Sequence, residues 1–188
     1  SLYNEKPLAI KREEALAMLE SHPDLADPAL SFDLHAGIER CYVTSGDRQQ
    51  QQRELVLMDA LAKELGDLPR QVDVLRRKVD LSSLLGQKED ALRSAEAAVQ
   101  LARQSGQQAL EAQALTSLGD LYYQQSRYDN AQACHEQALK LYEALNDLAG
   151  QAENWRLLGH LHMRAGRTEP AIQYSQRALK LFRQVGDL

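Results

Sequence analysis

The sequence predicts an all-α protein built from stacked helix pairs, and three observations lead to this prediction. The 188 residues include 5% aromatic residues and five prolines, and Ala, Leu, Gln, Glu and Arg dominate, which is the composition of long helices. Glycine recurs at steps of 20 residues. One segment of about 40 residues occurs twice in the same register. Together these features predict about four helix pairs preceded by one leading helix.

The 40-residue period is clearest when residues 114–147 are aligned with residues 154–187 without a gap. The matching positions are Leu118-Gly119 with Leu158-Gly159, Ala131 with Ala171, and Ala-Leu-Lys-Leu at 138–141 with the same residues at 178–181. The period continues toward the N-terminus and weakens there. Small residues that recur in register indicate sites where neighbouring helices cross closely, because glycine inside a helix otherwise costs about 1 kcal/mol.

The 20-residue period marks where helices end. The series comprises Gly46, Gly66, Gly86, Gly106, Gly166 and Gly186, and its two missing members are Ser126 and Asn146. Glycine and asparagine adopt the left-handed conformation that closes a helix. Helix starts follow these breaks, with Asp47, Asp67 and Ser126 as N-cap candidates and with Pro69 and Pro170 in first turns.

These signals predict nine helices, near residues 8–20, 29–45, 48–65, 69–85, 88–105, 108–125, 128–145, 149–165 and 168–185. Residues 1–28 are expected to form a leading helix and a linker, because two prolines and two aspartates interrupt 21–28. Residues 29–188 form the repeat array, in pairs 29–65, 69–105, 108–145 and 149–185.

The repeat resembles the tetratricopeptide repeat family. That family places a large apolar residue, Leu-Gly and an aromatic residue in its first helix, and two alanines in its second. The last pair supplies Trp155, Leu158-Gly159, Ala171 and Ala178, and the third supplies Leu115, Leu118-Gly119, Tyr122, Ala131 and Ala138. The second pair has Lys78-Val79 in place of Leu-Gly, and the first carries His35, Glu39 and Gln51 at key positions. The resemblance implies a right-handed helical-repeat solenoid.

The 40-residue form also resembles the repeat arrays attached to bacterial signal-transduction ATPases and regulators. This second resemblance implies a fragment of a larger regulatory protein. In the last helix, Ala171, Tyr174, Ala178 and Leu181 form one stripe, and Ile172, Leu179 and Phe182 form another. Since one partner helix covers one stripe, we expect further repeats or domains of the parent chain to follow.

The remaining composition argues against other classes of function. A net charge of −5 disfavours nucleic acid as a partner, and no apolar run approaches the roughly 18 residues of a membrane span. The histidines His135, His160 and His162 lack metal-ligand spacing and are expected on helix surfaces, as is the run Gln49–Gln52. No nucleotide-binding or nucleophile motif occurs, so we expect no enzyme, no cofactor and no metal. Cys41 and Cys134 are expected as free thiols in a cytoplasmic protein, although a disulfide stays open.

The family resemblance implies that the candidate functional site is a protein-binding groove. In the family, the first helices of successive pairs line a concave groove. The side chains expected there are Arg40, Arg76, Asp80, Asp120, Tyr123, Arg156, His160, Met163 and Arg164. The Lys and Asn clamp of the chaperone-tail-binding members is not expected, because Arg40, Asp80, Asp120 and His160 occupy those positions.

The expected function is therefore a non-catalytic interaction and scaffold module that binds a peptide or protein segment in signal transduction. The alternative is a small-ligand sensor that regulates an attached ATPase or DNA-binding domain. Charge is uneven: residues 1–150 hold 16 basic and 24 acidic side chains, and residues 151–188 hold 6 and 3. We therefore expect the C-terminal end, with Arg156 and Arg164, to attract a partner segment that carries acidic and apolar residues.

Overall fold

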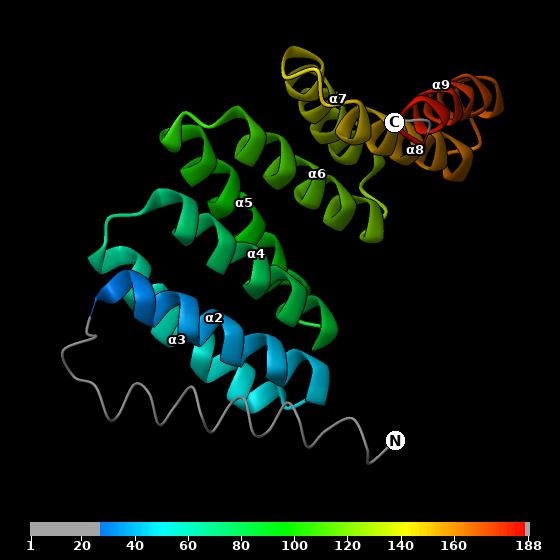
Figure 1. Ribbon diagram of the computed structural model, residues 1–188. Coiled ribbons are helices and arrows are strands. Elements are labelled where there is room, and N and C mark those ends of the chain that lie inside the picture. Colours follow the sequence, from blue (N-terminus) through cyan, green and yellow to red (C-terminus); the bar gives the residue numbers. More distant parts are fainter. Residues whose placement is uncertain (1–26, 187–188) are drawn as a thin grey trace. The chain divides into compact units, whose positions relative to one another are not determined.

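The computed structural model describes residues 27–186, and this part of the chain forms eight α-helices and no strand (Figure 1). The helices are α2 (Pro28–Ser45), α3 (Arg48–Glu64), α4 (Leu68–Leu84), α5 (Lys88–Ser105), α6 (Gln108–Gln124), α7 (Tyr128–Ala144), α8 (Leu148–Arg164) and α9 (Thr168–Gly186). Each bound lies within one residue of the prediction, which confirms the all-α repeat fold. The helix predicted over 8–20 lies outside the described residues.

The helices end where the 20-residue period predicts. The breaks adopt the left-handed conformation, with φ of 59° at Ser126, 54° at Asn146 and 63° to 78° at the glycines from Gly46 to Gly166. Ser126 was also expected to cap the next helix, and this was wrong. The N-cap of α7 is Arg127, because Ser126 already closes α6 with its positive φ. A glycine is favoured at such positions because its backbone adopts them without steric cost.

Aspartates cap the starts of several helices. The side chains of Asp27, Asp47, Asp67 and Asp147 each accept a hydrogen bond from a backbone N–H in the first turn that follows. Such a cap contributes about 1 kcal/mol, since it satisfies a donor that has no partner inside the helix. The predicted caps Asp47 and Asp67 are confirmed.

The chain divides into two compact units, residues 1–87 and 88–188, so α2, α3 and α4 belong to the first and α5 to α9 to the second. The boundary falls between α4 and α5, the helices that the sequence assigned to one pair, and each is described with its own unit. The core of the first unit contains Phe32, Leu55, Met58, Val74 and Leu81, with Ala36 and Ala62 between them.

The first unit buries polar side chains where the repeat pattern weakens. Gln51 on α3 is 2% exposed and donates from Nε2 to Glu39 Oε1 at 2.7 Å, and Glu39 on α2 is 1% exposed. Arg77 on α4 donates to Glu39 Oε2 at 2.6 Å. His35 Nδ1 lies 2.7 Å from Glu54 Oε2. The expectation that Gln51 lies on the surface was wrong, because hydrogen bonds satisfy it inside the unit.

In the second unit, consecutive helices pack on one another, and small residues occupy the crossings. Ala131 and Ala138 on α7 are fully buried, and Ala171 and Ala178 on α9 are 7% and 3% exposed. Gly119 on α6 lies against the ring of His135, so a Cβ there would come within 2.6 Å of the ring carbon Cε1. The recurring small residues therefore mark close helix contacts, as their register predicted.

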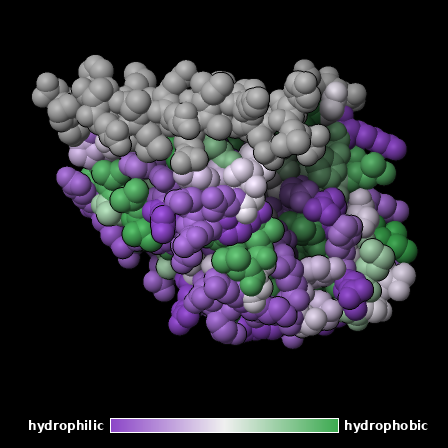
Figure 2. Space-filling model, turned by 90° about the horizontal axis from the view of Figure 1, so that it is seen from below, coloured by the Kyte–Doolittle hydropathy of each residue, from purple (hydrophilic) through white to green (hydrophobic). Residues whose placement is uncertain are grey.

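The surface is mixed. On the face drawn in Figure 2, hydrophilic residues alternate with separate hydrophobic patches. Within the described residues, no helix is both long and apolar enough to cross a membrane. Cys41 and Cys134 are free, and burial raises the pKa of the Cys134 thiol to about 11.

Candidate functional site

The nine side chains expected in the groove are divided between the two units. Arg40 on α2 and Arg76 and Asp80 on α4 belong to the first unit. The others lie in the second unit: Asp120 and Tyr123 on α6, and Arg156, His160, Met163 and Arg164 on α8. Each group is therefore described within its own unit.

In the second unit, α6 and α8 lie side by side. Asn154 Nδ2 donates to Thr116 Oγ1 at 3.2 Å, which joins the two helices, and to the carbonyl of Gly150 at 3.0 Å. Asn154 is 1% exposed, so these bonds satisfy a buried amide. Further along the same helices, a set of polar side chains is accessible. We call this set, which comprises Asp120, Tyr123, Glu153, Arg156 and His160, the α6/α8 face.

Arg156 is held by its own helix. Its Nε donates to Glu153 Oε2 at 2.8 Å, its Nη2 donates to Glu153 Oε1, and its Nη1 lies 3.4 Å from His160 Nδ1. The hydrogen bonds from Arg156 lower the pKa of Glu153, and the same pair raises the pKa of Arg156. Arg156 is therefore not an open cation, which reduces the positive charge expected on this part of the face.

Asp120 has a different environment. Its side chain is 43% exposed, and its Oδ1 lies 3.8 Å from Nε2 of His135. No described residue donates a hydrogen bond to its carboxyl group. Burial, followed by the negative charge of Glu153, raises the pKa of Asp120 to about 6, and Arg156 opposes the shift. The face thus carries a carboxylate whose hydrogen-bonding capacity is unused.

His135 lies on the buried side of Asp120. It comes from α7, its exposed fraction is 1%, and its Nδ1 has no hydrogen-bond partner among the described residues. Burial lowers the pKa of His135 to about 4, although Asn154 and Glu153 oppose the shift. The ring is consequently uncharged at neutral pH and does not neutralise Asp120.

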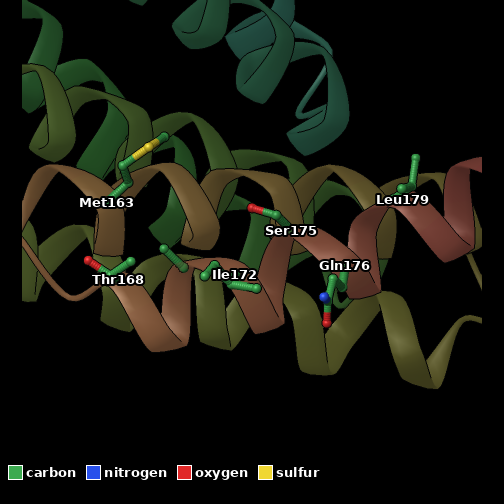
Figure 3. A pocket seen from close by; sticks show the side chains of 7 residues that line it. Met163, Thr168, Ile172, Ser175, Gln176 and Leu179 are labelled. Atoms are coloured by element: carbon green, nitrogen blue, oxygen red, sulfur yellow. The ribbon is translucent and has the colours of Figure 1, made fainter.

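The other predicted residues of the second unit are Tyr123, Met163 and Arg164. The Tyr123 ring packs at a tilt against Tyr128, with centroids 6.1 Å apart. Met163 is 61% exposed and lines a hollow of about 320 Å³ between α8 and α9. The other residues around this hollow are Thr168, Ala171, Ile172, Ser175, Gln176 and Leu179 (Figure 3). Arg164 is exposed near the end of α8.

The predicted residues of the first unit are exposed on α2 and α4. Arg76 donates from Nη2 to Asp73 Oδ1 at 2.9 Å, and Arg40 is exposed on α2. Burial raises the pKa of Asp80, and Arg76 opposes the shift. The two helices lie side by side, because Arg77 bonds Glu39 and Arg70 lies over the ring of Phe32, 5.3 Å from its centroid.

His135 was not predicted as part of the site. His135 and His162 were expected on the surface, and this was wrong: they are 1% and 5% exposed, whereas His160 is exposed. The available signal was the spacing of His135 from Ala131 and Ala138, which places it on the buried stripe of α7. Among the described residues, no group of three or more His, Cys, Asp or Glu side chains is arranged to hold a metal ion.

Known structures share this fold. BtubC from P. vanneervenii superposes with a TM-score of 0.80 at 19% identity, over 96% of this chain and 72% of that one. A second relative is a signal-transduction ATPase with numerous domains and a tetratricopeptide repeat sensor, from Pyrococcus horikoshii. It superposes with a TM-score of 0.79 at 18% identity, over 94% of this chain and 28% of that one. A Rap protein complexed with Competence and Sporulation Factor superposes with a TM-score of 0.76 at 16% identity, over 95% of this chain and 50% of that one. At these identities the likeness shows the fold.

A family model confirms the sequence resemblance. No curated protein sequence matches the chain. The model of the tetratricopeptide repeat matches residues 70–144 and again residues 110–184. The second match begins 40 residues after the first, which reproduces the period read from the sequence. These matches span more than half of the chain, which therefore belongs to the tetratricopeptide repeat family.

Proposed function

We propose that the chain is a non-catalytic interaction module that binds a peptide or protein segment along its first helices, in the cytoplasm. The observation that carries this proposal is the α6/α8 face. First helices of successive repeats lie side by side and present accessible polar and aromatic side chains, while α7 packs behind them. Such a surface suits an extended or helical segment, which can contact several repeats in turn.

The structural relatives support a role in regulation. The Rap protein was determined with Competence and Sporulation Factor bound, and the ATPase from Pyrococcus horikoshii carries its repeats as a sensor. The chain corresponds to 28% of that ATPase and 50% of that Rap protein. We therefore propose that it works as the recognition segment of a larger signalling protein.

The exposed stripe of α9 supports the proposal that further repeats follow. One period earlier, His135, Leu139 and Tyr142 on α7 are buried in the unit where α8 packs on α7. Their equivalents on α9 are Ser175, Leu179 and Phe182, which are all exposed, with Leu179 at 51% and Phe182 at 40%. Within residues 27–186, the same pattern of residues is thus covered by a following helix on α7 and by none on α9. By analogy with α8 on α7, the first helix of a following repeat would pack on this exposed stripe of α9.

The alternative function is a small-ligand sensor that controls an attached ATPase or DNA-binding domain. The tetratricopeptide repeat sensor of the Pyrococcus horikoshii relative favours it, and a polar cluster such as Asp120, Glu153 and Arg156 suits a small effector as well as a peptide. A thermal-shift screen of metabolites, set beside selection from a random peptide library, separates the two functions.

The proposed function is tested by selecting peptides on the folded chain and measuring their affinity for a charge-reversed face. Replacing Arg156 and Arg164 by Glu is expected to weaken selected peptides that carry acidic residues at least about tenfold, because the reversed charges repel those acidic residues. Replacing Lys180 and Arg183 by Glu changes the net charge equally on the exposed side of α9 and is the matched control. Circular dichroism melts verify folding. If no peptide is selected, or if the two double variants bind alike, the α6/α8 face is not the binding surface.

A further inference from the structure

Asp120 lacks the donors that three other partly buried carboxylates of the described chain receive. Glu39 receives hydrogen bonds from Gln51 and Arg77, and Asp59 pairs with Lys63 and Lys78. Asp73 likewise pairs with two arginines of its own helix, Arg76 and Arg77. Asp120 receives no such donor among the described residues. A carboxylate that has lost part of its hydration without gaining a donor from the protein keeps acceptor capacity for a ligand on its exposed side.

The cations and donors nearest to Asp120 do not compensate its charge. Arg156 is already bonded through two nitrogens to Glu153. His135 faces Asp120 from below at 3.8 Å but is uncharged at neutral pH, and its Nδ1 is unpartnered although the residue is 99% buried. Asp120, Glu153 and Arg156 together therefore carry one net negative charge.

The same place is open to a ligand. The Asp120 side chain is 43% exposed, and Tyr123 follows one turn later on α6, so its half-buried ring lies on the same side of the helix. A carboxylate with a neighbouring aromatic ring suits a guanidinium or an ammonium group, which can donate to the oxygens and lie against the ring. An anion would instead meet the unpaired charge of Asp120.

We propose that Asp120 anchors a cationic side chain, an arginine or a lysine, of the segment that binds the α6/α8 face. This inference rests on the proposed function and adds to it one recognition element. His135 lies on the buried side of Asp120, with its Nε2 3.8 Å from Oδ1, and does not neutralise the carboxylate. The acidic residues expected in the partner from the charge of residues 151–188 then face Arg164, and the basic residue faces Asp120.

The electrostatics of the site strengthen such binding. Burial and the charge of Glu153 raise the pKa of Asp120 to about 6, so the ionised form is held at a cost near neutral pH. The charged or titratable groups around it are Glu153 and Arg156 on α8 and His135 on α7. A bound cation relieves this cost, so binding is coupled to release of the Asp120 proton and strengthens as the pH rises through about 6.

The test begins with two small probes of matched shape. Nα-acetyl-arginine amide carries the cation, and Nα-acetyl-citrulline amide replaces the guanidinium with a neutral urea. The pKa of the Asp120 carboxyl group is followed by NMR in the presence of each probe. The arginine probe is expected to lower this pKa, and a fall of one unit corresponds to a tenfold preference for the ionised carboxylate. The citrulline probe is expected to leave it unchanged. Equal shifts with both probes would overturn the inference.

Two variants locate the effect. In Asp120→Asn the arginine probe is expected to leave the amide signals of Tyr123 and Glu153 unshifted. In the control Asp129→Asn, which alters a carboxylate with a 93% exposed side chain on α7, these signals are expected to shift as in the unaltered protein. Because Asn is close in shape to Asp and carries no charge, the first variant is expected to fold, and its amide spectrum verifies this. Signals that still shift in Asp120→Asn would place the cation elsewhere.

Peptide selection separates failure of this inference from failure of the proposed function. Peptides selected on the chain are expected to share one basic residue. Its replacement by citrulline or norleucine is expected to weaken binding roughly tenfold or more in the unaltered protein and about twofold or less in Asp120→Asn. Selected peptides without a shared basic residue that still lose affinity in the Arg156→Glu, Arg164→Glu variant contradict the inference and support the proposed function. An arginine probe that binds while no peptide is selected contradicts the proposed function and supports the cation site.

Discussion

Gly119 on α6 and His135 on α7 fit together, because the buried imidazole ring occupies the space that a side chain at Gly119 would fill. An added Cβ would come within 2.6 Å of Cε1 and 2.9 Å of both ring nitrogens. In this repeat, the glycine of the Leu-Gly motif is therefore required because the His135 ring packs against it. One repeat later, the same position, Gly159, lies against Ser175, whose Oγ would be 2.7 Å from an added Cβ.

The contact predicts strong coupling between the two residues. Gly119→Ala is expected to cost about 1–3 kcal/mol in the free energy of unfolding, because the buried ring has to move. In a His135→Ala background the same change is expected to stabilise by about 0.5–1 kcal/mol, since alanine favours the helix. Urea melts of the four proteins give the coupling as a double-mutant cycle.

The control for this prediction is Gly37→Ala. Gly37 lies inside α2, and a Cβ there meets no atom within 4 Å, so alanine is expected to stabilise by about 0.5–1 kcal/mol. Additive effects of the changes at Gly119 and His135 would mean that the ring does not restrict this position.

Asp120→Asn is expected to change the pH dependence of stability. The folded-state pKa of about 6 exceeds the ordinary value of 3.8, so ionisation opposes folding. Stability attributable to this group is fully present below about pH 4 and is lost as the pH rises through 6. The variant is therefore expected to be more stable than the unaltered chain by about 1 kcal/mol at pH 7 to 8, a value reduced for the exposure of the side chain.

Denaturant melts across this pH range check the sign. The difference between the two proteins should shrink as the pH falls below 6 and disappear below about pH 3, where both side chains are neutral in the folded and unfolded states. A gain that stays constant over the whole range would show that the carboxyl group titrates normally. Asp129→Asn, which alters an exposed carboxylate on α7, is measured alongside as the control.

Gln51→Leu is expected to cost about 1–3 kcal/mol, a loss similar to that of Ala131→Leu. Gln51 donates to the buried carboxylate of Glu39, and leucine would leave this oxygen without a donor. Ala131→Leu overpacks a position with no exposed surface. The neighbouring exposed change Gln52→Leu is expected to stay within about 0.5 kcal/mol. Comparable midpoints for Gln51→Leu and Gln52→Leu in urea would mean that the buried network adds nothing to stability.

Leu139 and Leu179 occupy the same repeat position but different environments. Leu139→Ala is expected to cost about 2–4 kcal/mol, because this side chain is 6% exposed. Leu179→Ala is expected to cost less than about 1 kcal/mol, since Leu179 is 51% exposed. In a chain extended by a copy of residues 148–186, Leu179 becomes covered and the two losses should converge. Thermal melts of the two variants in the original and in the extended chain measure these losses. If the difference between the losses of Leu139→Ala and Leu179→Ala stays the same in the extended chain, this argues against a following repeat on α9.

The sequence by itself determined the helices and their register. Left-handed residues at steps of 20 end the helices from α2 to α8 through local backbone geometry, so these bounds needed no tertiary information. The 40-residue period likewise determined that Ala131, Ala171 and Gly119 lie at close crossings, because small residues recur there for a packing reason. Membership of the family followed from the same positions.

Only the tertiary structure decided which polar side chains meet. Glu39 and Gln51 appeared as departures from the pattern, yet they bond each other across α2 and α3. Arg156 appeared as an open cation, yet Glu153 three residues earlier neutralises it, since both side chains lie on one side of α8. His135 was assigned to the surface, yet the contact with Gly119 draws it under Asp120. Contacts between helices depend on rotamers and on distances across the repeat, which a linear pattern of residue types does not encode.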